Sequence, residues 1–508
     1  MKPEKRALDS SVVRIPLLLS LLALSLGTSN AIAGSCADLA QLKTPHVSAE
    51  VATEVTSGHL NGTDSRGGLT GLPPFCRVVV QIAPTTDSRI GAEIWLPLTR
   101  WNNKFLAVGS GGWGGAISYD ELADGLGRGY AAAATDDGHT SAGGSFVMGH
   151  PEKLIDFAYR AEHEMTLEAK RLIEAFYGQV PAHSYWSGCS GGGREGLLQA
   201  ARYPQEFDGV IAGDPANVRR NAWALSIAVQ TFKDRTAYIP PEKYPMIHKA
   251  VLNACDASDG LKDGLIEEPE HCQVDFKVLE CKGADGSGCL TARQVQSAQA
   301  IISPLKDSAG KVLFPRLEPG TELRWARLAG GPRPADLFLD EYRYVVFGNP
   351  DWDWRTFDVD RDAARAHAID SHVDEFDPNL TAFANRGGKL LIYHGWADQQ
   401  VAPGSSVEFY NAARQQSAVK PAGTDWIRLF MVPGMGHCQG GEGPDTFDAL
   451  GALEQWVEKG HAPERIIASQ RSNGQVVRTR PLCPYPQVAR YDGKNNPGEA
   501  ASFTCRSS

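Results

Sequence analysis

The sequence has no apolar run long enough to cross a membrane as a helix, which takes about 20 residues. Its most apolar stretch, IPLLLSLLALSL, covers only residues 15–26. Four basic residues precede this stretch, and the tripeptide Ala31-Ile32-Ala33 follows it. A charged start, a short apolar region and an A-x-A site are typical of a secretory signal peptide. We therefore expect residues 1–33 to be removed, and the mature protein to be secreted or periplasmic without a membrane anchor.

The sequence also lacks a basic cluster. Its 50 Lys and Arg residues are outnumbered by 60 Asp and Glu residues, which gives a formal net charge of −10. Such a chain has no electrostatic attraction for phosphate groups, so we expect no nucleic-acid partner. Low-complexity tracts and internal repeats are absent as well. The length of 508 residues is enough for one large domain that carries a substantial insertion.

No C-x-x-C pair occurs, and the cysteines are spread over the whole length, which argues against clustered zinc ligation. An even number of cysteines in an exported chain predicts a set of disulfides. The sequence alone does not choose among the many ways of pairing them. The ten cysteines are at positions 36, 76, 189, 255, 272, 281, 289, 438, 483 and 505.

Short apolar runs that resemble buried strands alternate with helical patterns. This alternation predicts a mostly parallel sheet with helices on both faces, an α/β fold. Between residues 219 and 385 the pattern changes to a stretch with four cysteines, many prolines and several tryptophans. We expect this stretch to be an inserted lid domain that divides the catalytic domain into residues 34–218 and 386–508. The strand-like runs are residues 104–113, 129–139, 207–215, 387–398 and 427–438, and the longest helical pattern is 154–178.

The stretch HSYWSGCSGGGREG contains G-x-S-x-G with Ser190 at its centre. In an α/β-hydrolase this motif forms the turn between a strand and a helix, where glycines prevent clashes and leave the serine hydroxyl exposed. An apolar strand precedes the motif here, and a helical pattern follows it. These surroundings make Ser190 the candidate nucleophile of a serine hydrolase.

Chain order in this fold places an acid and then a histidine after the nucleophile. Asp398 ends the apolar run of YHGWAD and is the favoured acid, while Asp214, one strand earlier, is its rival or a helix cap. His437 lies in the glycine turn PGMGHC, from which it can reach Ser190 with one ring nitrogen and Asp398 with the other. His394 is the alternative base, although a role in the pocket suits it better.

Cys189 directly precedes Ser190, just as Cys438 directly follows His437. If the serine and the histidine are within hydrogen-bond distance, their chain neighbours can approach the Cα separation of 4.4–6.8 Å that a disulfide needs. We therefore expect a Cys189–Cys438 bond that fastens the nucleophile turn to the base loop.

The oxyanion hole needs two backbone N–H donors. The residue after the nucleophile, Gly191, is expected to supply one donor. The glycine-rich run GSGGWGG is expected to supply the other, with Gly112 as the best candidate and Gly111 next to it.

The loop CDASDGLKDGL carries Asp256, Asp259 and Asp263, with glycines between them. Hard carboxylate oxygens that fold back on themselves suit calcium, with backbone carbonyls completing the shell. The spacing is not that of an EF-hand, and a solvated acidic loop is the alternative. The loop is remote in sequence from Ser190 and has no histidine ligand, so we expect a structural metal rather than one that activates water.

Together, the motifs GCSGGGREG, YHGWAD, GMGHC, GSGGWGG and CDASDGLKDG make the chain similar to the tannase and feruloyl esterase family. The resemblance covers essentially the whole chain after residue 33. The family includes feruloyl, chlorogenate and tannin esterases and hydrolases of terephthalate monoesters. It implies calcium in the lid, bound by the three aspartates and by the main-chain carbonyls of Leu261 and Leu265. It also implies the pairs Cys36–Cys76, Cys189–Cys438, Cys255–Cys272, Cys281–Cys289 and Cys483–Cys505.

These observations predict a secreted serine esterase that cleaves small esters of aromatic acids, of hydroxycinnamic or gallic type, through an acyl-enzyme. Hydrolysis of terephthalate monoesters or other small aryl esters is the alternative within the same chemistry. A binding protein with a disabled hydrolase fold is the rival from another class, but no member of the triad is missing. The aromatic stretch RYVVFGNPDWDW, residues 343–354, is a candidate wall of the acyl pocket or plain lid core.

Overall fold

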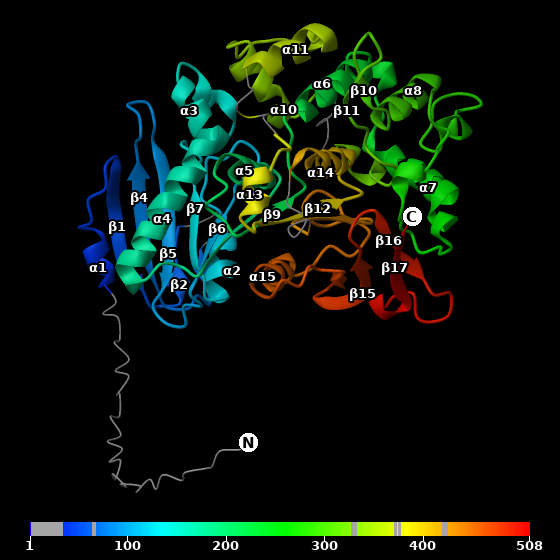
Figure 1. Cartoon of the computed structure of the whole chain (residues 1–508). Helices are drawn as coiled ribbons and strands as arrows, with labels where there is room; N and C mark the ends of the chain where they lie inside the picture. Colours follow the sequence, from blue (N-terminus) through cyan, green and yellow to red (C-terminus); the bar gives the residue numbers. More distant parts are fainter. Residues whose placement is uncertain are drawn as a thin grey trace, which may run out of the picture.

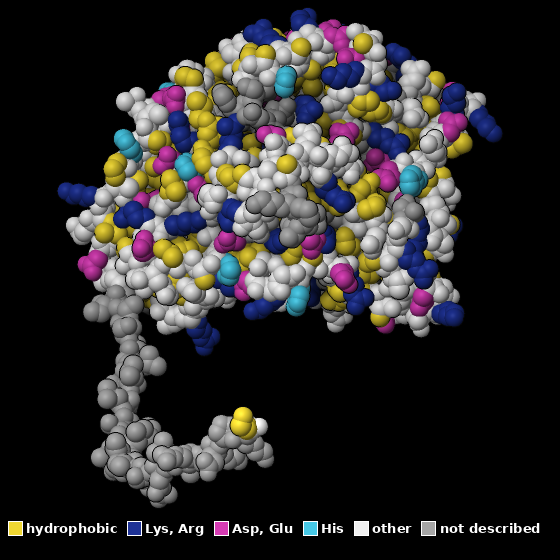
Figure 2. All heavy atoms as spheres, viewed as in Figure 1, with side chains coloured by type: hydrophobic (Ala, Val, Ile, Leu, Met, Phe, Trp, Pro, Cys, Tyr) yellow, Lys and Arg dark blue, Asp and Glu magenta, His cyan; other side chains and the backbone are white. Residues whose placement is uncertain are grey.

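The computed structural model describes residues 1, 34–62, 68–326, 333–369, 373, 377–418 and 425–507. The expected signal peptide therefore lies outside the described residues, apart from Met1. No helix among the described residues has the length and apolar character needed to cross a membrane. On the face shown in Figure 2, acidic and basic side chains are interspersed, in keeping with the lack of a basic cluster in the sequence.

A nine-stranded sheet forms the centre of the molecule, in the order β1-β4-β5-β7-β6-β8-β9-β12-β13 (Figure 1). The strands from β7 to β13 in this order are all parallel, which confirms the predicted α/β fold. The strands β1, β4 and β5 add an antiparallel edge that the apolar runs did not indicate. The bounds are β1 (Val47–Val55), β4 (Phe75–Ile82), β5 (Ile90–Pro97), β6 (Lys104–Val108), β7 (Ala131–Thr135), β8 (His183–Cys189), β9 (Gly209–Gly213), β12 (Lys389–Gly395) and β13 (Ile427–Val432).

Helices cover both faces of the sheet, because successive side chains of each central strand point to opposite faces. In β6, Phe105 belongs to one hydrophobic core and Leu106 to the other. The first core is covered by α4 (Ala161–Tyr177), α5 (Gly191–Arg202), α13 (Thr381–Asn385) and α14 (Gly404–Gln416). The second core is covered by α2 (Tyr119–Gly127) and α15 (Ala449–Lys459).

Between β9 and β12 the chain leaves the sheet and forms a helical insertion, residues 219–369, drawn in green to yellow at the top and right of Figure 1. The insertion has a hydrophobic core of its own, which includes Trp223, Ile247 and Phe276. Its main helices are α6 (Arg219–Phe232), α7 (Tyr244–Cys255), α8 (Ala292–Ile301), α10 (Asp336–Asp340) and α11 (Val359–Ile369). The helix α13, at the end of the expected lid range, packs instead in the core beneath the sheet.

Two hairpins end the chain and contact the insertion beside α7 (Figure 1). The backbone N–H of Ala489 donates to Glu267 Oε1 at 3.0 Å, and Arg480 forms an ion pair with Asp263. The hairpins are β14 (Ile466–Ser472) with β15 (Gln475–Leu482), and β16 (Gln487–Tyr491) with β17 (Phe503–Ser507).

Five disulfides join the cysteines in the pairs that the resemblance implied. Their Cα–Cα distances run from 5.0 to 5.9 Å, within the range of disulfides in proteins. No cysteine of the described residues is free. The pairs are Cys36–Cys76, Cys189–Cys438, Cys255–Cys272, Cys281–Cys289 and Cys483–Cys505.

Candidate active site

Ser190 lies on a sharp turn between β8 and α5. Its backbone has φ 60° and ψ −116°, a conformation that a residue with a side chain rarely adopts. The close approach of the chain on either side requires glycine, because a Cβ on Gly188 would lie 2.5 Å from the backbone of Gly192. This geometry is the strained strand-to-helix turn on which α/β-hydrolases present a nucleophile.

The structure brings the three predicted catalytic residues together. His437 Nε2 lies 2.8 Å from Ser190 Oγ, and His437 Nδ1 lies 2.7 Å from Asp398 Oδ2. Asp398 is fully buried, and its other carboxylate oxygen accepts hydrogen bonds from the backbone N–H groups of Gln400 and Val401. The histidine ring therefore connects the serine hydroxyl to a carboxylate that is itself held in place.

The electrostatics of the site keep Asp398 ionised. Burial by itself raises the pKa of this carboxyl, but the charges and hydrogen bonds of His437 and His394 outweigh burial and hold the pKa well below its usual range. An ionised carboxylate at Nδ1 fixes the histidine tautomer and stabilises the imidazolium that forms when Nε2 takes a proton.

His394, the alternative base, contacts the acid rather than the nucleophile. Its Nε2 lies 3.2 Å from Asp398 Oδ2, and its Nδ1 lies 2.7 Å from Ser406 Oγ. The ring is fully buried. His394 therefore contacts the same oxygen of Asp398 as His437 and helps to hold the carboxylate in place.

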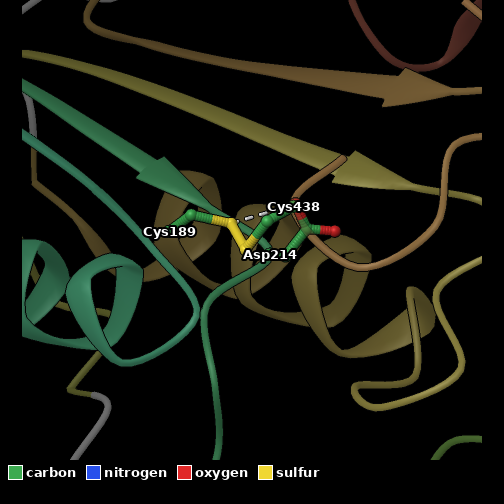
Figure 3. Close-up of side chains that lie close together, drawn as sticks. All are labelled: Cys189, Asp214 and Cys438. Atoms are coloured by element: carbon green, nitrogen blue, oxygen red, sulfur yellow. Dashed lines mark hydrogen bonds between the residues drawn. A yellow bond between two sulfur atoms is a disulfide. The ribbon is translucent and has the colours of Figure 1, made fainter. Parts of the chain in front are cut away.

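Asp214, the rival acid, also lies close to the triad but contacts the disulfide. Its Oδ2 lies 3.4 Å from Cys189 Sγ (Figure 3). Its Oδ1 accepts a hydrogen bond of 3.0 Å from the backbone N–H of Gly395. A carboxyl oxygen of Asp214 lies within 4.8 Å of ligand atoms of Asp398 and His437. The ring of His437 forms hydrogen bonds with Asp398 and Ser190, so the geometry favours Asp398 as the acid of the triad.

The Cys189–Cys438 bond joins the nucleophile turn to the histidine loop, with a Cα–Cα distance of 5.9 Å (Figure 3). Ser190 and His437 are the immediate chain neighbours of these cysteines. The bond therefore limits the movement of Ser190 relative to His437.

The glycine-rich loop after β6 reaches the nucleophile helix. A Cβ on Gly191 would lie 3.4 Å from Gly111 Cα, and Gly112 has φ +63°, which favours glycine. Among the described residues, no hydrogen-bond acceptor is paired with the N–H of Gly112 or of Gly191. Both backbone donors thus remain available at the turn that carries Ser190.

A buried carboxylate that the sequence analysis did not single out holds this loop. Glu195, on α5, accepts hydrogen bonds from Ser110 N at 3.0 Å and from Ser110 Oγ at 2.8 Å. The carbonyl of Ser110 accepts a hydrogen bond of 2.7 Å from Gly192 N. Glu195 stands within the motif GCSGGGREG, but its contact depends on tertiary packing that the motif does not reveal.

In the acidic loop of the insertion, aspartate side chains accept hydrogen bonds from backbone N–H groups of the same loop. Asp256 Oδ1 accepts from the N–H groups of Asp263 and Gly264, both at 3.1 Å, and Asp259 Oδ1 accepts from Leu261 N at 2.9 Å. The Cys255–Cys272 bond closes the segment. Three groups of His, Cys, Asp and Glu side chains in the described residues have ligand atoms within 4.8 Å of one another, and none of them contains these aspartates. The donor set of three carboxylates with nearby carbonyls nevertheless has the chemistry that calcium prefers.

The aromatic stretch 343–354 packs partly on itself and partly against the cluster of Trp113 and Phe157, which Tyr344 contacts. Phe347 and Trp352 stack with ring centroids 5.0 Å apart, and Tyr342 stacks on Trp352 at 5.6 Å. Another residue of the insertion, Leu337, approaches the glycine-rich loop. Its side chain lies 3.7 Å from the position of a Cβ on Gly112. Trp113 Nε1 donates to the carbonyl of Leu337 at 3.1 Å, so the insertion contacts the glycine-rich loop through this residue.

Comparisons with known proteins agree with this geometry. The family model described as tannase and feruloyl esterase matches residues 76–506. An uncharacterised esterase of Xanthomonas campestris is 36% identical over 534 aligned positions, which cover 94% of this chain and 92% of the relative. A probable feruloyl esterase B-2 of Aspergillus fumigatus is 35% identical and covers 85% of this chain and 86% of the relative.

Solved structures show the same likeness. The crystal structure of feruloyl esterase B from Aspergillus oryzae has a TM-score of 0.87 and 32% identity, and covers 92% of this chain and 98% of that one. A tannin acyl hydrolase from Aspergillus niger has a TM-score of 0.74 at 24% identity over 91% of this chain and 92% of that one, which shows a shared fold.

Proposed function

This chain belongs to the tannase and feruloyl esterase family, whose members cleave esters of aromatic acids, and from that premise we propose that it works through Ser190 as a covalent nucleophile. The observation that carries the proposal is the position of the His437 ring, hydrogen-bonded to Ser190 Oγ on one side and to Asp398 on the other. An activated serine of this kind forms an acyl-enzyme with a carboxylic ester.

In the first half of the reaction, Ser190 Oγ attacks the ester carbonyl carbon while His437 Nε2 takes the hydroxyl proton. The carbonyl oxygen becomes an oxyanion that the N–H groups of Gly112 and Gly191 stabilise. The tetrahedral intermediate then releases the alcohol, which leaves with the proton from His437. The aromatic acyl group remains bound to Ser190 as an ester.

In the second half, His437 takes a proton from water as the water oxygen attacks the acyl-enzyme carbonyl. The second tetrahedral intermediate breaks the bond to Ser190 Oγ and releases the aromatic acid. His437 returns its proton to the serine, so the enzyme ends in its starting state. Throughout, Asp398 compensates the positive charge of the imidazolium.

We assign the helical insertion the role of a lid over this site. The contact of Leu337 with the glycine loop supports that role, because it places an insertion side chain beside an oxyanion donor. A lid at this position excludes water from the acyl group and supplies apolar surface for an aromatic ring.

A structural calcium ion is proposed in the loop closed by Cys255 and Cys272. The ligands would be the side chains of Asp256, Asp259 and Asp263 and the carbonyls of Leu261 and Leu265. A bound cation would offset the clustered negative charge and order the loop against the C-terminal hairpin, where Arg480 already pairs with Asp263. The ion has no part in the proposed chemical steps.

We also propose that the protein is exported. It contains five disulfides, and disulfides form and persist in oxidising compartments. Mass analysis of the N-terminus of the exported protein would test cleavage after Ala33. A protein that starts at Met1 after export would contradict it.

A substrate panel tests the proposed activity. The purified protein is assayed with methyl ferulate, chlorogenic acid, methyl gallate and a terephthalate monoester, beside the variant Ser190→Ala. We expect turnover of at least one aromatic ester by the native protein and loss of turnover in the variant, with an unchanged melting temperature. Equal turnover in the variant would rule out Ser190 as the nucleophile.

A further inference from the structure

A second carboxyl group is buried beside the proposed catalytic acid, and the proposed steps do not use it. Asp214 directly follows β9, has no exposed surface, and has φ 37°, in the region that favours glycine or asparagine. The neighbouring strand β12 determines its surroundings, because the backbone N–H of Asp214 donates to the carbonyl of Tyr393 at 2.9 Å. A strained conformation at a buried acid indicates a constraint on where that side chain must lie.

The hydrogen-bond donors in this pocket are distributed unequally between the two carboxyls. Asp398 accepts from His437, from His394 and from two backbone N–H groups. Asp214 accepts from the backbone N–H of Gly395, and its other oxygen faces the sulfur of Cys189. That sulfur is in a disulfide and carries no hydrogen, so it offers a carboxylate no hydrogen bond (Figure 3).

Two carboxyls within 4.8 Å of one another in a buried site cannot both ionise without strong repulsion. The member that accepts more hydrogen bonds and faces more positive charge keeps the negative charge, and the other keeps the proton. Here the donors favour the charge on Asp398. Burial, opposed by His394 and reinforced by the charge of Asp398, raises the pKa of Asp214 to about 8.

We propose that Asp214 is a positioning residue that acts as a neutral acid. Its Oδ1 holds Gly395 N–H, at the start of the loop that carries Asp398, while its proton keeps a second negative charge out of the pocket. The triad acid thereby remains both ionised and correctly placed against His437. The inference rests on the proposed function, since it assigns Asp214 a task in the same site.

Loss of the proton from Asp214 at alkaline pH would place a second anion against Asp398. The titratable groups that face Asp214 are Tyr393 and His394 on β12, Asp398 in the following loop, and His437 beyond β13. Cys189 and Cys438 do not titrate, because they form a disulfide. Repulsion between the two carboxylates would move Asp398 away from His437, so we expect the reactivity of Ser190 to fall at alkaline pH.

The test measures nucleophile reactivity with a fluorophosphonate, which requires no knowledge of the natural ester. Ser190 Oγ forms a bond to phosphorus, fluoride leaves with the P–F bond electrons, and His437 takes the serine proton. The rate of labelling is measured from pH 6 to pH 10 on the full-length protein and three variants. Asp214→Asn keeps the Oδ1 acceptor and cannot ionise, and Asp214→Gly removes the carboxyl but suits a positive φ. Asp398→Asn is the comparison for a lost charge.

We expect Asp214→Asn to label within about threefold of the native rate at pH 7, because an amide reproduces a neutral carboxyl and its hydrogen bond. We also expect it to lack the alkaline decline of the native protein. Asp214→Gly should label about tenfold more slowly, because it loses the hydrogen bond to Gly395. Asp398→Asn should label about 10⁴-fold more slowly, because it leaves the histidine in the wrong tautomer.

Two results would overturn the proposal. Labelling of folded Asp214→Asn as slow as that of Asp398→Asn would show that Asp214 acts as an anion. Superimposable pH profiles of the native protein and Asp214→Asn would show that its proton has no role. A native protein that is not labelled at Ser190 at all would instead contradict the proposed function.

Discussion

Removal of the Cys189–Cys438 bond should both destabilise the protein and slow its reaction. The double variant Cys189→Ala/Cys438→Ala is the suitable change, because a serine at position 189 would present a new hydroxyl donor to Asp214. The bond joins residues 249 positions apart. Loss of the bond raises the conformational entropy of the unfolded chain. The loop-entropy relation gives about 5.5 kcal/mol of lost stability for a loop of this length.

A second disulfide supplies the matched control. The Cys281–Cys289 bond, in the insertion, joins residues 8 positions apart. The same relation gives about 2.5 kcal/mol for the loss of that bond. Because errors in the relation affect both estimates alike, the expected difference of about 3 kcal/mol is the firmer prediction.

Urea unfolding of the native protein and of both double variants measures the free energies, and ester hydrolysis is measured where each variant is fully folded. The Cys189/Cys438 variant should have the lower midpoint and a reduced kcat, because Ser190 and His437 are no longer joined covalently. The Cys281/Cys289 variant should keep the native kcat. A Cys189/Cys438 variant as stable as this control, with native kcat, would refute the reasoning.

Three further predictions concern the same site and the acidic loop. Asp398→Asn should lower kcat about 10⁴-fold with little change in the melting temperature, and steady-state kinetics with a scan of unfolding would check both. Glu195→Gln should lower kcat about tenfold with KM unchanged, because it weakens the hydrogen bonds that hold Ser110 and the glycine-rich loop. A tenfold rise in KM with kcat unchanged would contradict this expectation. Chelation with EDTA should lower the melting temperature while activity persists until unfolding, and restored calcium should reverse the shift; prompt loss of activity in the folded protein would contradict a structural ion.

The parallel half of the sheet and the close approach of the candidate catalytic residues could be predicted because their signals are local. Most strands of the parallel half are short apolar runs, and three of them precede residues of the candidate site: β8 before Ser190, β12 before Asp398 and β13 before His437. The glycines around Ser190 also predict the local structure, because a tight turn requires them. Cysteines adjacent to Ser190 and His437 then made the disulfide between them predictable.

The strands β4 and β5 are largely buried and apolar, but packing determines their antiparallel pairing, the edge strand β1 and the supporting contacts, so these could not be predicted. The strand β1, VSAEVATEV, has mostly exposed and half-buried positions, so it has no continuous apolar run. The bond between Glu195 and Ser110 joins elements that are distant in sequence. The aromatic stretch 343–354 has the composition of a binding pocket, but Phe347 and Trp352 stack on each other and Tyr344 packs against the cluster of Trp113. Composition does not distinguish an aromatic core from an aromatic site.

Trapping of the acyl-enzyme tests the central claim most directly. The native protein is mixed with an activated ferulate ester, quenched in acid at early times, and analysed by intact mass and by peptide mapping. We expect one feruloyl group, attached at Ser190 and absent from Ser190→Ala. Turnover of the ester with the acyl group on another residue, or with an equal yield in the alanine variant, would contradict it.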